Sequence, residues 1–341
     1  MNDMWRPQVG APMLNDPAVL LHLNYWRKRK LVQPVVVCLV LAVLMFVLHR
    51  GFSMLGVVLL GLAAVSVTAF VQFRSRVGWW LPAAESVLDG APPVRVRSQV
   101  VGGAGAWTLL SVDGGRLYLR VTNTERAVRQ FAARQREVSL IGPNADGVAA
   151  VMLDSLPVPL PAKVVPAPPN PQPVPVTDED LSRWAAANTA RAVYLGLAVV
   201  GLCGASVVFD LLLTIDGWLP ATIGFVFVLV VALVASFFRR GDQHRMVKLL
   251  RNGPWQAYPV QLLSWTGNPA LVGRLRLALT LPDGSQLPVS ARFGPAWLVA
   301  NIAATGTLWV AGNPKHGQAA AVGLPGHPHV AAVRFQELQA R

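Results

Sequence analysis

The sequence is poor in charged residues. Asp, Glu, Lys and Arg make up 14% of its 341 residues, against about a quarter in ordinary soluble domains. So few charged side chains would cover the surface of a soluble protein of this size poorly, which argues against that class. Cysteine is scarce too. Cys38 and Cys203 stand far apart in apolar runs, which excludes a disulfide framework and a cysteine-based zinc site.

Familiar catalytic and nucleotide-binding motifs are missing. The sequence has no phosphate loop, no Gly-x-Ser-x-Gly and no metalloprotease helix, and the glycines at 102–105 lack the third glycine of a dinucleotide loop. His327 and His329 would share one face of a strand, but the nearest third ligand is His316. We therefore predict no catalytic residue, no cofactor, no metal site and no identifiable small-molecule ligand, and we expect a protein that is not an enzyme.

Long apolar runs are abundant. Residues 31–49 and 52–72 contain no Asp, Glu, Lys or Arg, and residues 192–214 and 220–238 form a second such pair, with Asp210 as its acid. A bilayer core of about 30 Å needs about 20 apolar helical residues. The predicted fold class is therefore an α+β membrane protein with four transmembrane helices, arranged as two hairpins. Small residues such as Gly56, Gly61 and Gly201 are expected where these helices pack.

The net charge of +13 has two interpretations. An excess of positive charge can bind nucleic acid or acidic lipid. Here much of it flanks the apolar runs, at residues 27–30 and 239–248, which is typical of the positive-inside rule. We therefore expect no nucleic-acid partner and a multi-pass protein of the cell membrane, with both termini cytoplasmic. Trp79 and Trp80 beside Arg76 suggest an aromatic belt at the membrane interface.

After each predicted hairpin, the sequence alternates between apolar and polar residues with a period of two. Residues 94–97 alternate Val and Arg, and Asp113-Gly114 is a hairpin signal between two further alternating runs. This pattern predicts a small cytoplasmic β domain of about five strands and one helix. The strands are expected at residues 94–97, 107–112, 117–121, 138–141 and 148–153, and the helix at 124–136.

The β domain is repeated. Asp113, Gly142 and Gly147 recur as Asp283, Gly312 and Gly317 at one constant offset of 170 residues (283 − 113, 312 − 142 and 317 − 147). The pair Pro93-Val94 is aligned with Pro259-Val260 at the start of the first strand. A constant offset with the same order of elements indicates internal duplication.

Nine prolines between Pro157 and Pro175 predict an extended linker between the two copies. The expected domain organisation has seven segments. They are an N-terminal segment with an interfacial helix (1–30), hairpin 1 (31–72), β domain 1 (73–156), a Pro-rich linker (157–176), a second interfacial helix (177–191), hairpin 2 (192–238) and β domain 2 (239–341).

Three functions are compatible with this organisation. The first is a scaffold or docking protein that presents the two β domains to a protein partner or to another copy of the chain. The second is a small transporter or channel subunit, suggested by Asp210, since ionisable groups within membrane spans are often functional. The third is a sensor of anionic lipid that uses the basic residues 27–30 and 239–248.

Overall fold

The computed structural model describes most of the chain outside the second predicted hairpin. The described residues are 4–8, 10–28, 32–48, 54–177, 180–188, 245–267 and 272–335, with the single helical residues 191, 198, 201, 202, 204 and 206. They belong to two compact units. One unit comprises Met1–Lys28, Arg76–Asn188 and Arg245–Arg341, and the other comprises Arg29–Ser75 and Thr189–His244.

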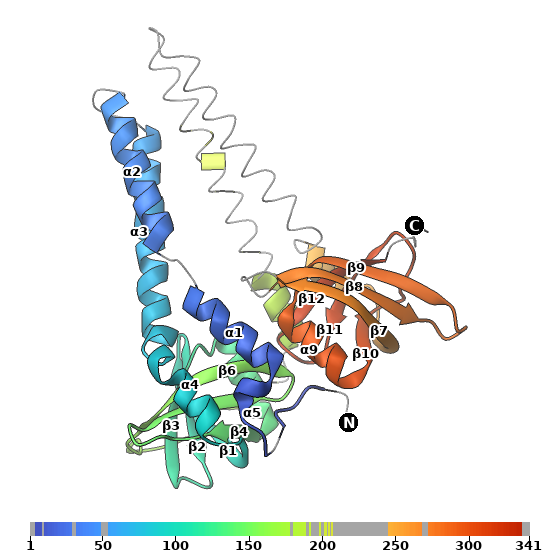
Figure 1. The fold of residues 1–341 in the computed structure, drawn as a ribbon, viewed down its shortest axis with the longest axis horizontal. Coiled ribbons are helices and arrows are strands. Elements are labelled where there is room, and N and C mark those ends of the chain that lie inside the picture. The colour runs from blue at the N-terminus through green and yellow to red at the C-terminus, as the bar shows by residue number, and fades with distance from the viewer. Residues whose placement is uncertain are drawn as a thin grey trace. The chain divides into compact units, whose positions relative to one another are not determined.

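The first unit contains two closed barrels of six antiparallel strands each (Figure 1). In barrel 1, β1 (Val94–Ala104) pairs with both β2 and β4, which closes the sheet. The other strands of barrel 1 are β2 (Trp107–Val112), β3 (Leu117–Thr122), β4 (Glu137–Ile141), β5 (Val148–Leu153) and β6 (Leu156–Val165). Barrel 2 consists of β7 (Trp255–Gly267), β8 (Val272–Thr280), β9 (Gln286–Pro295), β10 (Thr307–Ala311), β11 (Ala319–Gly323) and β12 (Val330–Phe335).

The two barrels share one topology. Barrel 1 has the strand order β1-β2-β3-β6-β5-β4, and barrel 2 has the corresponding order β7-β8-β9-β12-β11-β10. A helix precedes the fourth strand of each barrel, namely α5 (Arg126–Gln135) and α9 (Ala296–Thr305). Gly142 and Gly312 have φ of 85° and 82°, so both copies need glycine for the same left-handed turn.

Apolar side chains fill both barrels. Leu119, Val151 and Leu153 are fully buried in barrel 1, and Leu277, Val310 and Phe335 are fully buried in barrel 2. Small barrels are closely filled by their own side chains. Phe131 of α5 and Ile302 of α9 join these clusters, so each barrel is a packed core rather than a channel.

The predicted fold class is wrong. It proposed four transmembrane helices with small five-stranded domains, whereas the structure has two closed six-stranded barrels. In the described part of the chain, one helix, Leu55–Gly90, is long and apolar enough to cross a membrane, and Val35–Val47 is apolar but shorter. The second predicted hairpin, 192–238, falls outside the described residues apart from a few single positions. These findings do not support a description as a multi-pass protein with cytoplasmic β domains.

The missed strand is β6, which occupies the first part of the predicted Pro-rich linker. Pro157, Pro159 and Pro161 are two residues apart, so their missing N–H groups all fall on one edge of the strand. Pairing with β3 begins only at Ala162, whereas β5 pairs with β6 from Leu156 to Lys163. The strand therefore tolerates prolines that a linker would also contain.

Helix α1 (Pro17–Lys28) packs on the barrels, against β6 and α9. Asp16 caps it, since its Oδ1 accepts a hydrogen bond from the Ala18 N–H at 2.8 Å. Leu23 is fully buried, and Trp26 meets Trp80 edge to face at 6.2 Å between ring centroids. Trp80 is fully buried and donates its indole N–H to the Ala149 carbonyl at 2.9 Å, so it is no membrane-interface residue.

The second unit contains the helical hairpin of α2 (Val32–Leu48) and α3 (Met54–Phe73). Ala42, Met45, Leu55 and Leu59 are buried between the two helices. A Cβ at Gly56 would lie 2.9 Å from the Phe46 ring, whereas one at Gly61 would meet nothing within 4 Å. Gly56 is therefore the expected small residue at a helix contact, and Gly61 is not part of this contact.

Candidate functional site: the junction between the barrels

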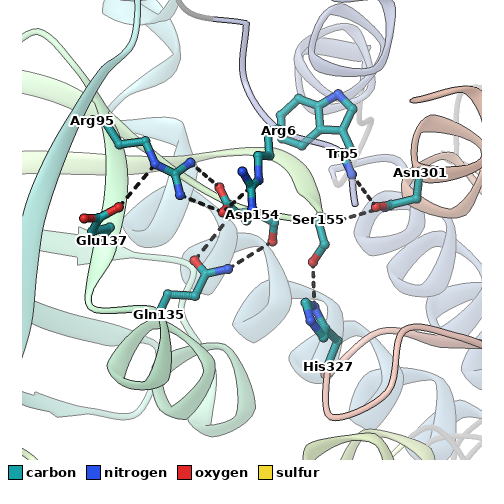
Figure 2. Close-up of polar contacts among 9 residues, drawn as sticks. All are labelled: Trp5, Arg6, Arg95, Gln135, Glu137, Asp154, Ser155, Asn301 and His327. Atoms are coloured by element: carbon teal, nitrogen blue, oxygen red, sulfur yellow. Dashed lines mark hydrogen bonds and ion pairs between the residues drawn. The ribbon is translucent and has the colours of Figure 1, made fainter. Parts of the chain in front are cut away.

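The turn between β5 and β6 is buried, although turns usually lie at the surface. Asp154 is 7% exposed and Ser155 2% exposed. Ser155 has a φ of 66°, in the left-handed region that few residues other than glycine adopt. The side chains that bury this turn come from the N-terminal segment and from barrel 2, so it marks the junction of the two barrels (Figure 2).

Asp154 is fully engaged by basic and amide groups. Arg95 donates two hydrogen bonds to its carboxylate, both of 2.8 Å, and Arg6 forms an ion pair with it at 3.5 Å. Gln135 hydrogen-bonds the Asp154 backbone N–H and C=O, each at 3.3 Å. The hydrogen bonds to Asp154 raise the pKa of Arg95. Paired charges of this kind fix the turn in place.

A ring of three hydrogen bonds joins the N-terminal segment, barrel 1 and barrel 2. The Ser155 N–H donates to the Trp5 carbonyl at 2.7 Å, the Trp5 N–H donates to Asn301 Oδ1 at 2.9 Å, and Asn301 Nδ2 donates to the Ser155 carbonyl at 2.9 Å (Figure 2). Asn301 is 5% exposed. Because these groups are removed from water, each one would be costly to leave unpaired.

Two histidines from the loop before β12 complete the junction. The Nδ1 of His327 lies 2.7 Å from Ser155 Oγ, and the imidazole packs against Phe131 with 4.4 Å between ring centroids. His329 packs against Trp297 at 5.6 Å between ring centroids, and within the described part of the chain its buried Nε2 has no hydrogen-bond partner. Burial lowers the pKa of each histidine to about 4, so both are neutral at pH 7.

Ser155, His327 and Asp154 have the residue types of a hydrolytic triad but not its geometry. In a triad the serine hydroxyl must reach the substrate, and the acid must orient the histidine. Here Ser155 is 2% exposed, and the carboxylate of Asp154 is bound to Arg95. These residues therefore hold two barrels together.

The histidines singled out in the sequence have different surroundings in the structure. His327 and His329 lie half-buried in the junction, and His316 is exposed. Among the described residues, no group of three His, Cys, Asp or Glu side chains could hold a metal ion. Cys38 lies on α2, half-buried. Asp210 and Cys203 lie outside the described residues.

Sequence reasoning missed Trp5, Ser155 and Asn301. Asn301 offered a signal, because it is the single polar residue in the run Ala296–Ala304 of an otherwise apolar helix. A lone polar residue there indicates a buried hydrogen bond. Its partners lie 146 and 296 residues away in sequence, so no local pattern identifies them.

Comparison of the chain with protein-family models, with curated proteins and with solved structures found no match.

Proposed function

We propose that this chain is a non-catalytic scaffold that holds its two barrels at a lipid bilayer, where they dock a protein partner or a second copy of the chain. The observation that carries the proposal is the exposed apolar surface of the α2–α3 hairpin. Val43, Val47 and Val65 are 61%, 67% and 66% exposed. Contiguous apolar surface of this kind on a protein marks an interaction site or a membrane contact.

A bilayer is the occupant that best fits the hairpin. Exposed valines and leucines occur along both helices, and neither α2 nor α3 contains a charged residue. A protein partner in water would usually leave a polar face on one side of each helix. Helices that are apolar on all sides are typical of lipid contact.

The barrels themselves support docking by their outer surfaces. Their interiors are filled by apolar side chains, so neither offers a lumen for a substrate. The junction joins both barrels through buried polar contacts. Barrels that these contacts hold in one arrangement would present a fixed surface, which lowers the entropic cost of binding a partner.

Light scattering on the full chain extracted in mild detergent tests the docking proposal. After correction for bound detergent, we expect a protein mass larger than one chain, from a second copy or from a co-purified partner. Cross-linking in intact membranes before extraction controls for a complex that detergent dissociates. A single chain in both measurements would contradict the proposal.

A further inference from the structure

A groove of about 380 Å³ lies on the outer side of barrel 1, beside β1, β2 and β3. Alternation along β1 turns Arg97 and Gln99 outward, because Val96 and Val100 on either side of this pair face the core. Ser111 and Tyr118 are directly opposite each other on β2 and β3. Pro171, from the segment after β6, lines the groove as well, and the Val174 N–H donates to the Val100 carbonyl at 2.8 Å, which holds that segment beside β1.

Two hydroxyl groups converge at Gly115. A Cβ at this position would lie 3.1 Å from the Tyr118 hydroxyl and 3.9 Å from Ser111 Oγ. The φ of Gly115 is 96°, which disfavours any larger residue there. The hairpin turn therefore leaves a small space bordered by two hydroxyls.

The polar groups of the groove have no partners in the described part of the chain. Neither the Arg97 guanidinium nor the hydroxyls of Ser111 and Tyr118 make an ion pair or a side-chain hydrogen bond there, although Ser111 is only 7% exposed. By contrast, Arg95 binds both Asp154 and Glu137. Arg97 is exposed and Tyr118 is half-buried, so water can reach these groups. The groove therefore offers three donors that no other side chain in the described part of the chain occupies, and an anion can accept hydrogen bonds from them.

Barrel 2 shows that the fold does not require this arginine. Glu137 of β4 lies opposite Arg97, and Thr307 of β10 lies opposite Pro259. The two strands correspond at the offset of 170 residues (307 − 137). The next residue of each strand makes the corresponding hydrogen bond. The Ser98 N–H donates to the Arg136 carbonyl, and the Val260 N–H donates to the Gly306 carbonyl, both at 2.8 Å. Arg97 therefore corresponds to Pro259, and barrel 2 has no arginine at this position.

We propose that this groove binds one phosphate group, with the Arg97 guanidinium as its cation and the hydroxyls of Ser111 and Tyr118 as further donors. Arginine presents a planar pair of N–H donors that matches phosphate oxygens. The adjacent turn adds no net charge, since Asp113 and Arg116 have opposite signs. The phosphate belongs either to a small solute or to a lipid headgroup. The proposal does not depend on the scaffold function.

Calorimetric titration of the full chain in detergent tests the site, with inorganic phosphate and short-chain phosphatidate as separate probes at constant ionic strength. Arg97→Gln should weaken binding about ten-fold or more, and Tyr118→Phe by a smaller factor, because the arginine contributes an ion pair with the phosphate and the tyrosine only a hydrogen bond. Arg116→Gln is the matched control. It removes an exposed arginine from the same hairpin and should leave binding unchanged.

Each outcome of the titration bears on the proposal. Binding of either probe that depends on Arg97 supports it. Binding of phosphatidate alone assigns the phosphate to a lipid, and equal binding of both probes assigns it to the phosphate group itself. Absence of binding by both probes overturns the proposal, as does an equal loss in the Arg97→Gln and Arg116→Gln variants. An unchanged unfolding temperature of the Arg97→Gln variant establishes that its loss of binding comes from the groove and not from a destabilised fold.

Discussion

Replacing Asn301 with alanine should lower the free energy of unfolding of the two-barrel unit by about 3 kcal/mol. The substitution removes the acceptor for the Trp5 N–H and the donor to the Ser155 and Trp297 carbonyls. Asn301 is 5% exposed, so water does not readily replace these partners. Denaturant unfolding of the full chain, followed by tryptophan fluorescence, measures the change.

The matched control for this prediction is Asn24→Ala. Asn24 is also a helical asparagine, but it is exposed on α1. Surface substitutions of this kind change stability by less than about 0.5 kcal/mol. If the two variants were equally stable, the hydrogen-bonded ring between the barrels would contribute nothing measurable, and the junction as described would be wrong.

Acidification should weaken the junction between pH 6.5 and 4. Burial lowers the pKa of His327 and His329 in the folded chain to about 4, from 6.5 in the unfolded chain. The unfolded chain therefore binds more protons in this range, so stability is fully present above pH 6.5 and falls as the pH approaches 4. The loss is on the order of 3 kcal/mol for each histidine.

Neighbouring charges modify this pH dependence only partly. Asp154 raises the pKa of His327 while Arg134 lowers it, and His327 and His22 both lower the pKa of His329. The pKa of His22 itself is lowered by burial. For every one of the three histidines, burial is the largest cause of the shift. Protonation is therefore unfavourable throughout the junction.

His329→Leu tests the assignment of this acid sensitivity. The Nε2 of His329 has no hydrogen-bond partner among the residues that the structure describes, so an apolar side chain of similar size should be tolerated at pH 7 and should flatten the decrease in stability toward pH 4. His316→Leu, at an exposed position, should keep the wild-type slope. An unchanged slope in His329→Leu, measured by unfolding at several pH values, would contradict the buried-histidine explanation.

Local strand signals in the sequence predicted most of barrel 1. The Asp113-Gly114 turn located β2, and the turn residues Gly142-Pro143-Asn144 located β5, both with their observed bounds, Trp107–Val112 and Val148–Leu153. Two features of the sequence give a wrong prediction. The alternate prolines of β6 are typical of a linker as well, and the Pro93–Pro259 alignment was four residues out of register, since Pro259 corresponds to Arg97.

The sites depend on distant residues, and this is why sequence patterns did not predict them. Trp5 and Asn301 are 296 residues apart, and Ser155 and His327 are 172 apart. Arg97 belongs to the alternating pattern that predicts β1. The sequence does not show that, among the described residues, Arg97 has no ion pair while the nearby Arg95 has two. Closure of the barrels, which depends on pairing between β1 and β4, is likewise a long-range property.

Cysteine accessibility in intact membranes tests the central claim most directly. In a chain whose own Cys38 and Cys203 are replaced by alanine, a cysteine at Val65 should react with a membrane-impermeant maleimide only after detergent is added, because Val65 is an exposed position on the apolar hairpin. A cysteine at Arg116, exposed on barrel 1, should react once the membrane side that carries the barrels is open to the reagent. Rapid labelling at Val65 under the conditions that label Arg116, without detergent, would contradict the proposal that the hairpin lies in lipid.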